Sequence, residues 1–330
     1  MGAELRKVAQ GLVAPGKGIL AADESGGTIE KRFASIGVAS TEENRRSYRE
    51  LLFTTPRMEN SISGVILFDE TTKQESADGI RFVELLAQKG VRPGIKTDKG
   101  LETFGKYEEQ TTKGLEGLVE RSKDYKDFGL VFAKARSVFK IAADTTTEEL
   151  IIRNAEFQTK YAQISQAAGL MPIVEPEVLI DGDHSIEKCK KVSFIVLGEV
   201  FAQLKKGGID FRGMLLKPSM ITPGKSSQEK VTDEEIARET IDVLLQTVPS
   251  EVPGIVFLSG GQTPDEATRR LRLMNKLYKN SVPWQLSFSF GRALQDAPLK
   301  AWVGKPENTK DAQEAFLYWA NLNSLARSGR

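Results

Sequence analysis

The chain has 330 residues, of which 40% are hydrophobic and 28% are charged, and its 46 basic residues almost balance its 45 acidic residues. This balance removes any general electrostatic reason to expect nucleic acid or an anionic membrane as a partner. A single cysteine excludes an internal disulfide framework, and a single histidine argues against zinc or copper sites, which need several such ligands. No apolar run approaches the length of a membrane span. We therefore expect a cytoplasmic enzyme that uses neither a metal nor another cofactor.

Short apolar runs recur along the chain at a steady spacing. Most of them are nearly continuous, which is typical of strands that are buried on both faces. We expect eight strands, at residues 18–23, 63–68, 94–97, 130–134, 171–175, 213–217, 254–259 and 284–289.

Helical signals lie between these runs. Four helix starts are indicated by a hydroxyl residue with glutamate three positions later, at Ser40, Thr145, Thr232 and Thr263. A last helix is expected over residues 309–325. Strands and helices that alternate in this way indicate a (β/α)8 TIM barrel, formed as one domain by residues 1–330. The alternative is a doubly wound open sheet, but the first strand is not followed by a GxGxxG turn.

Active sites of such barrels lie at the carboxyl ends of the strands. Three successive runs end at Lys134, Glu175 and Lys217, and this places two amines beside a carboxylate. Burial and a neighbouring cation both lower the pKa of a lysine, so Lys217 becomes a candidate nucleophile with Lys134 as the cation. Glu175 can then move protons while a carbinolamine loses water to form an imine, which accepts electrons when a carbon–carbon bond breaks.

Other polar residues follow the same strand ends. Asp23 and Glu177 are further catalytic candidates, and Arg136 is a further candidate for binding substrate. The alternative for all these charged residues is that they only form ion pairs with one another at the rim of the barrel.

The loops after the seventh and eighth strands are rich in glycine and are typical of phosphate sites in barrels. Their candidate residues are Ser259, Gly260, Gly261, Ser289, Gly291 and Arg292. A second set, after the first and third strands, could hold a second phosphate across the barrel mouth. It comprises Ser25, Thr28, Arg32 and Lys96. For Ser25 and Thr28, a role as the cap of a helix is equally open.

Together these motifs resemble class I fructose-1,6-bisphosphate aldolases over nearly the whole chain. The resemblance rests on PGKGILAADES, TEENRRSYRELL, GVILFDET, GIKTDKG, FAKxR, PIVEPEVLxDGDH, LLKPxMxTPG, FLSGGQ and SFGRALQ. It implies the same barrel and the reversible cleavage of fructose 1,6-bisphosphate to dihydroxyacetone phosphate and glyceraldehyde 3-phosphate, in glycolysis and gluconeogenesis. By the same analogy we expect a homotetramer.

The resemblance also implies roles for individual residues. Lys217 would form the Schiff base, Glu175 would be the general acid and base, Lys134 would assist carbinolamine chemistry, and Asp23 would position the C4 hydroxyl. One phosphate would contact Ser259, Gly260, Gly291 and Arg292. The second phosphate would contact Ser25, Thr28, Arg32 and Lys96.

Three positions depart from the family pattern. Ala135 stands where the family usually has tryptophan, and we expect a hole that loosens Lys134. Ser219 stands where asparagine is frequent, and Phe290 replaces the usual tyrosine. These changes leave open a shifted preference for fructose 1-phosphate or sedoheptulose 1,7-bisphosphate. A barrel retained only as a non-catalytic scaffold is a further alternative, against which the intact charged cluster argues.

The sequence ends in Ser-Gly-Arg330, without the tyrosine-ended tail that many family members carry. From the resemblance we expect slower protonation of the enamine intermediate, or a substitute proton donor such as Glu175.

Overall fold

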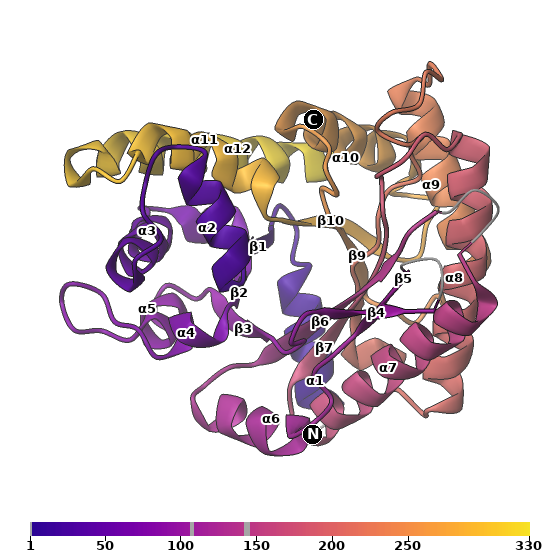
Figure 1. Cartoon of the computed structure of the whole chain (residues 1–330), viewed down its shortest axis with the longest axis horizontal. Coiled ribbons are helices and arrows are strands. Elements are labelled where there is room, and N and C mark those ends of the chain that lie inside the picture. Colours follow the sequence, from indigo (N-terminus) through magenta and orange to yellow (C-terminus); the bar gives the residue numbers. More distant parts are fainter. Residues whose placement is uncertain (1, 106–108, 142–145) are drawn as a thin grey trace.

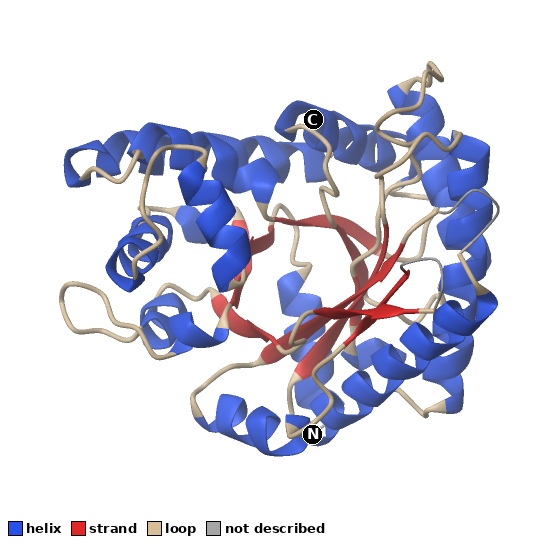
Figure 2. Ribbon diagram, viewed as in Figure 1, coloured by secondary structure: helices blue, strands red, loops and turns tan. Residues whose placement is uncertain are grey.

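The computed structural model describes residues 2–105, 109–141 and 146–330. Eight parallel strands close into a barrel in the order β1-β10-β9-β8-β7-β6-β3-β2, and helices surround it (Figures 1 and 2). The strands are β1 Gly18–Ala22, β2 Ile62–Leu67, β3 Arg92–Lys96, β6 Phe132–Phe139, β7 Met171–Val178, β8 Leu215–Leu216, β9 Gly254–Phe257 and β10 Gln285–Phe290. The predicted (β/α)8 fold is confirmed, and the open sheet is excluded because β1 pairs with β10.

Each predicted strand overlaps an observed one, but two of them extend several residues beyond their predicted ends. Strands β6 and β7 continue past residues 134 and 175 and pair in register up to residues 139 and 178. Lys134 and Glu175 therefore lie within these strands rather than at their ends. Lys217, by contrast, directly follows the short strand β8.

The α-helices are α1 Gly2–Leu12, α2 Gly26–Ala34, α3 Glu42–Thr54, α4 Asp69–Thr72, α5 Phe82–Gln88, α6 Leu118–Asp127, α7 Glu148–Ala167, α8 Ile186–Lys206, α9 Asp233–Thr247, α10 Pro264–Tyr278, α11 Arg292–Trp302 and α12 Thr309–Arg327. Helices α3, α7, α8, α9 and α10 begin at a hydroxyl residue whose side chain accepts a free backbone N–H group. Within residues 2–105, 109–141 and 146–330, none of the helices combines the length and the apolar character needed to cross a membrane.

The predicted helix starts are confirmed in part. Thr263 and Glu266 form a complete capping box at α10, and Thr232 caps α9. Helix α3 is capped by Thr41 rather than by Ser40, because the Thr41 side chain accepts the Asn44 N–H. Thr145 lies outside the described residues, and the cap of α7 is Thr147.

A two-stranded antiparallel sheet, β4 Leu101–Phe104 with β5 Glu109–Thr112, was not predicted. Its sequence is polar and lacks the alternation that marks a strand. Tertiary contacts hold it in place: the amide oxygen of Asn154 on α7 accepts the Thr111 hydroxyl at 3.1 Å, and its amide nitrogen donates to the Val138 carbonyl at 3.2 Å. The hairpin therefore depends on a buried polar anchor rather than on its own pattern.

The barrel interior is closed at its amino-terminal mouth by α1, which is visible through the ring of strands in Figure 1. Side chains of α1 such as Leu5, Val8 and Leu12 pack against inward-facing strand residues that include Phe132 and Ile173. A second and larger apolar cluster fills the layer between the strands and the surrounding helices. This packing leaves the carboxyl ends of the strands as the place for a site.

Arg327, in the last turn of α12, clamps the two ends of the chain together. The residue is 5% exposed, and its guanidinium donates to the carbonyls of Val13, Ala14 and Lys17, just beyond the end of α1. Among the described residues it has no carboxylate partner, and burial lowers its pKa to about 10.

Replacing Arg327 with methionine should lower the free energy of unfolding by about 2 kcal/mol, since buried carbonyls lose their donors. The shift of the urea midpoint measures this loss. Arg330→Ala removes an exposed arginine three residues further on and serves as the control. Equal midpoints for Arg327→Met and the control would contradict the clamp.

Candidate active site

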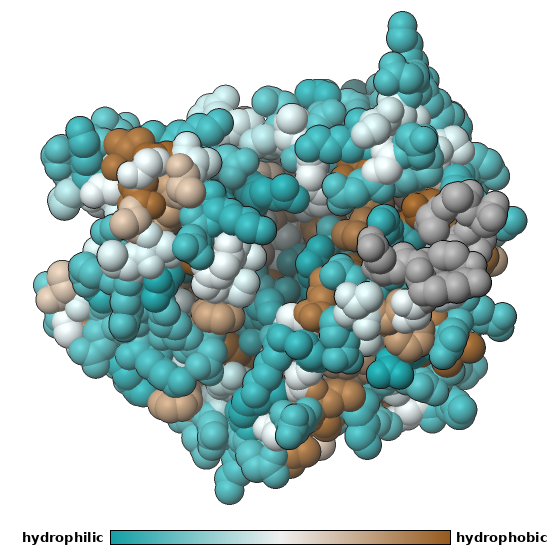
Figure 3. Space-filling model, viewed as in Figure 1, coloured by the Kyte–Doolittle hydropathy of each residue, from teal (hydrophilic) through white to brown (hydrophobic). Residues whose placement is uncertain are grey.

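A cavity of about 610 Å³ opens at the carboxyl ends of the strands, where the space-filling view is hollowed (Figure 3). All the predicted site residues line it except Gly261. Gly261 instead follows Gly260 in a turn where both have positive φ, 49° and 83°, and a Cβ at Gly261 would meet Ile180 at 3.0 Å. Gly261 is therefore needed for the shape of the loop, and its direct contact with substrate stays a prediction.

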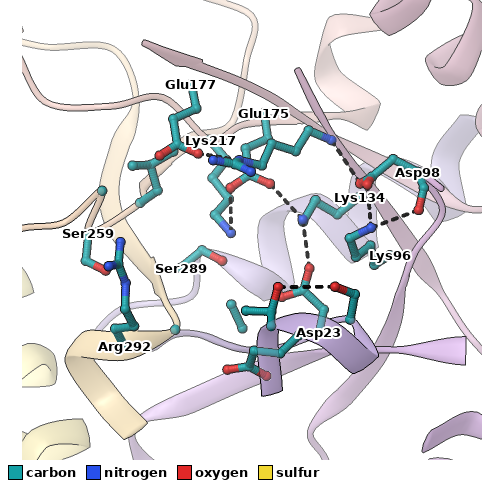
Figure 4. A pocket seen from close by; sticks show the side chains of 18 of the residues that line it. Asp23, Lys96, Asp98, Lys134, Glu175, Glu177, Lys217, Ser259, Ser289 and Arg292 are labelled. Atoms are coloured by element: carbon teal, nitrogen blue, oxygen red, sulfur yellow. Dashed lines mark hydrogen bonds and ion pairs between the residues drawn. The ribbon is translucent and has the colours of Figure 1, made fainter. Parts of the chain in front are cut away.

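Four charged side chains form one connected cluster at the floor of the cavity (Figure 4). Lys134 Nζ lies 2.7 Å from Asp23 Oδ2 and 2.9 Å from Glu175 Oε2. The other oxygen of Glu175 lies 3.0 Å from Lys217 Nζ. The side chains of both lysines and of Glu175 are at most 5% exposed, so water screens these pairs weakly.

Mutual attraction keeps most of this cluster ionised in spite of its burial. Burial lowers the pKa of Lys134, but Asp23 and Glu175 outweigh it and the pKa is raised. Burial raises the pKa of Asp23, but Lys134 and Lys217 outweigh it and lower the pKa to about 2. The pKa of Glu175 is lowered in the same way. Lys134, Asp23 and Glu175 are therefore charged at neutral pH.

The influence of Lys134 on Lys217 as a neighbouring cation stays a prediction, to which the structure adds a carboxylate between the two amines. Glu175 bridges the two ammonium groups with its two oxygens, so the ion pair of Lys217 is with a carboxylate. The register of the sheet produces this arrangement: Arg136 on β6 pairs with Glu175 on β7, and Lys134 lies two residues earlier on the same face.

The expectation that Ala135 leaves a hole beside Lys134 is wrong. Successive residues of a strand face opposite sides, so Lys134 points into the barrel while Ala135 is fully buried in the layer beneath the helices. The Ala135 carbonyl accepts the Gln158 amide at 3.1 Å. Lys134 is held by two ion pairs and is not loosened.

The other two departures also lie off the cavity. The Ser219 hydroxyl donates to the Val178 carbonyl at 2.8 Å and so ties the loop after β8 to the end of β7. Phe290 is fully buried, with its ring centroid 5.5 Å from that of Phe288. Ser219 and Phe290 are not among the described residues that line the cavity. None of the three departures therefore changes a lining side chain.

One end of the cavity is formed by the loops after β9 and β10. Ser259 and Arg292 lie close together there in Figure 4, and Arg292 is the first residue of α11. Ser289 faces the cavity with a buried hydroxyl that has no hydrogen-bond partner in the described structure. Arg292 likewise makes no ion pair to a described residue. An unpaired guanidinium and the free N–H groups at the start of a helix form an anion site.

The opposite end lies after β1 and β3. Ser25 is the N-cap residue of α2, but its side chain makes no capping bond and instead lies 3.1 Å from the Thr28 hydroxyl. Ser25 therefore occupies the capping position of α2, but its hydroxyl does not cap the helix. Arg32 pairs with Glu24 and, at 3.1 Å, with Asp296.

Two further ion pairs hold cations of the cavity. Arg136 pairs with Glu177. Burial lowers the pKa of Arg136, but the carboxylate of Glu177 outweighs burial and the pKa is raised. Lys96 pairs with Asp98.

Sequence reasoning missed several lining residues. They are Ala21, Lys31, Asp98, Gly100, Leu101 and Leu258. Two of them carried a usable signal: Asp98 is an acidic residue two positions after the end of β3, and Lys31 lies one helical turn after Thr28. Within the described residues, no group of three or more His, Cys, Asp or Glu side chains is arranged to hold a metal ion.

The fold and this site define a barrel enzyme with two buried lysines that share one glutamate in a cavity at the carboxyl ends of the strands. The family model described as fructose-bisphosphate aldolase class-I matches residues 4–330, and the chain belongs to this family.

Individual relatives agree with this assignment. The chain is 54% identical to fructose-bisphosphate aldolase 6, cytosolic, of Arabidopsis thaliana, over 96% of this chain and 88% of the relative. It is 51% identical to a fructose-bisphosphate aldolase of Echinococcus multilocularis, over 99% and 90% of the two chains. Among solved structures, the aldolase of Plasmodium falciparum in complex with TRAP and a small-molecule inhibitor has a TM-score of 0.97 and 47% identity, with 99% and 95% of the chains covered.

Proposed function

We propose that this protein catalyses the reversible cleavage of fructose 1,6-bisphosphate into dihydroxyacetone phosphate and glyceraldehyde 3-phosphate through a Schiff base at Lys217. Family membership over residues 4–330 supports the reaction. The single structural observation that carries the mechanism is the buried contact of Glu175 with both Lys134 and Lys217. It places a proton carrier within reach of an amine in a cavity large enough for a sugar phosphate.

In the first half of the reaction, the neutral amine of Lys217 attacks the C2 ketone of the sugar. Glu175 lies 3.0 Å from this amine and is placed to exchange protons with the carbinolamine, which loses water to give an iminium ion. Lys134 remains protonated because its pKa is raised, and it holds Glu175 and Asp23 in position.

Cleavage follows from the electron demand of the iminium ion. The electrons of the C3–C4 bond move to the nitrogen to form an enamine, while Asp23 accepts the proton of the C4 hydroxyl and glyceraldehyde 3-phosphate leaves. The enamine then takes a proton at C3, for which Glu175 is the proposed donor: Lys134 gives one of its protons to Glu175 and takes the C4 hydroxyl proton from Asp23, since it contacts both carboxylates. Hydrolysis of the resulting iminium ion releases dihydroxyacetone phosphate and restores Lys217.

The two ends of the cavity take the two phosphates. Because Lys217 is assigned to C2 and Asp23 to C4, the end beside Asp23, with Ser25 and Lys96, takes the C6 phosphate. The opposite end, with Ser259 and Arg292, takes the C1 phosphate. Glu177 supports this arrangement by holding Arg136 at the wall of the cavity, so we propose it as a positioning residue.

The setting of the enzyme is proposed from its relatives. Two Arabidopsis relatives at 54% and 53% identity are named cytosolic, and we propose the cytosol for this protein as well. A homotetramer, a single domain over residues 1–330 and independence from metals and other cofactors stay predictions.

Reductive trapping tests the proposed mechanism. The protein is incubated with fructose 1,6-bisphosphate, reduced with borohydride and mapped by mass spectrometry. We expect inactivation and one sugar-phosphate adduct at Lys217, with no adduct when substrate is omitted. An adduct at Lys134 alone, or turnover without any adduct, would contradict the assignment. EDTA should leave turnover unchanged, and a loss of turnover in EDTA would contradict the metal-free mechanism.

A further inference from the structure

Lys96 and Asp98 form a shielded ion pair at the end of the cavity assigned to the C6 phosphate (Figure 4). Lys96 Nζ donates to the Asp98 carboxylate and, at 2.8 Å, to the Asp98 backbone carbonyl. The side chains are only 13% and 5% exposed. Water therefore screens this pair less than it screens a surface pair, and separating the two charges has a real cost.

The carboxylate of Asp98 is itself held in place. Its second oxygen accepts the backbone N–H of Arg136 at 3.2 Å. The preceding residue, Thr97, donates its N–H to the Lys134 carbonyl at 2.9 Å, so the segment after β3 is fastened to β6. Asp98 cannot easily follow Lys96 if the ammonium group turns toward a ligand.

The two ends of the cavity therefore differ in how freely they can bind an anion. At the C1 end, Arg292 makes no ion pair with any residue in the described ranges. At the C6 end, the ammonium of Lys96 is already neutralised by Asp98, and the guanidinium of Arg32 by Glu24 and Asp296. Of these three carboxylates, Asp98 has the least exposed side chain, and it is the ion-pair partner of Lys96.

We propose that Asp98 is a specificity-determining residue that restrains Lys96 and thereby weakens the contribution of the C6 phosphate to binding. This inference rests on the proposed function and deepens it. A phosphate dianion that reaches Lys96 meets a pair with no net charge and approaches a carboxylate that repels it. Fructose 1-phosphate carries an uncharged hydroxyl at C6 in place of the phosphate, so it does not need the charge of Lys96 and does not encounter the restraint. Asp98 thus lowers the preference of the enzyme for the bisphosphate over the monophosphate.

Asparagine at position 98 should release Lys96. The amide has the shape of the carboxylate but offers one acceptor oxygen instead of two. If that oxygen keeps the Arg136 N–H, the amide nitrogen faces the Lys96 ammonium, and the two donors repel each other. The lysine then carries an unpaired charge that can turn to the C6 phosphate.

The test compares kcat/KM for fructose 1,6-bisphosphate and fructose 1-phosphate in the wild type and in Asp98→Asn. We expect the ratio of the two values to rise roughly threefold to tenfold, the effect of one charge near a phosphate in a wet pocket. A lower ratio would mean that Asp98 presents Lys96 to the phosphate, and this would overturn the inference. Equal changes for both substrates would show a structural role only, and would overturn it too.

Asp242→Asn is the matched control. Asp242 Oδ2 lies 2.7 Å from Lys190 Nζ, and neither residue lines the cavity. It should leave the ratio unchanged. A second comparison uses Lys96→Met with and without Asp98→Asn: once the lysine is absent, the asparagine should not change the ratio further. A change of the same size in both backgrounds would exclude action through Lys96. Absence of turnover and of a Lys217 adduct in the wild type would instead refute the proposed function itself.

Discussion

Replacing Lys217 with methionine is expected to reduce kcat for cleavage of fructose 1,6-bisphosphate by about 10⁴-fold or more. Methionine has nearly the length of lysine but no amine, so neither the carbinolamine nor the iminium ion can form. The fold should survive, since Glu175 keeps its ion pair with Lys134 at 2.9 Å and is not left as an isolated buried charge. Steady-state kinetics and circular dichroism measure the two expectations.

Lys300→Met provides a control for the loss of one lysine, because Lys300 lies exposed on α11. It should retain wild-type kcat and the borohydride adduct at Lys217. Ordinary cleavage by Lys217→Met would rule out the Schiff base at this position, whatever the state of the other lysine.

Replacing Lys134 with methionine should have the largest effect on stability. Lys134 is the cation shared by Asp23 and Glu175, and its side chain is 4% exposed. Without it, Asp23, whose side chain is 13% exposed, loses its ion-pair partner, and we expect the free energy of unfolding at neutral pH to fall by about 3 kcal/mol. Urea unfolding measures this loss. Activity should fall as well, because Glu175 and Asp23 lose the group that positions them.

The pH dependence of this loss identifies its cause. In the wild type, the pKa of Asp23 is lowered from 3.8 to about 2, so its stabilising contribution is present above pH 3.8 and is lost as the pH falls toward 2. The contribution is about 2 kcal/mol, by the usual conversion of a pKa shift into free energy. Lys134→Met removes this contribution at neutral pH. The difference in stability between the wild type and the variant should therefore narrow as the pH is lowered below about 4.

A compensating change separates charge from packing. Asp23→Asn in the Lys134→Met background removes the unpaired carboxylate and should recover part of the stability, but not the activity. A double variant as unstable as Lys134→Met alone would indicate that lost packing, and not an isolated charge, causes the defect.

Local patterns in the sequence were sufficient to predict the barrel and the central cluster. Each buried strand is nearly continuous in apolar residues, and the capping box of Thr263 and Glu266 forms from neighbours in the chain. Charged residues appear in three of these apolar runs, at Lys134, Glu175 and Lys217. A buried charge needs a partner whether or not it lies at the end of its strand. Each of these signals is contained in a short stretch of the chain, so it can be recognised without knowing the fold.

Only the tertiary structure decided which of these charges meet. Glu175 lies between the two lysines, and Lys96 pairs with Asp98, because of how β3, β6 and β7 are aligned across the sheet. The β4–β5 hairpin forms through a buried asparagine on a distant helix. Register and long-range hydrogen bonds join residues far apart in the chain, and no pattern within a single segment encodes them.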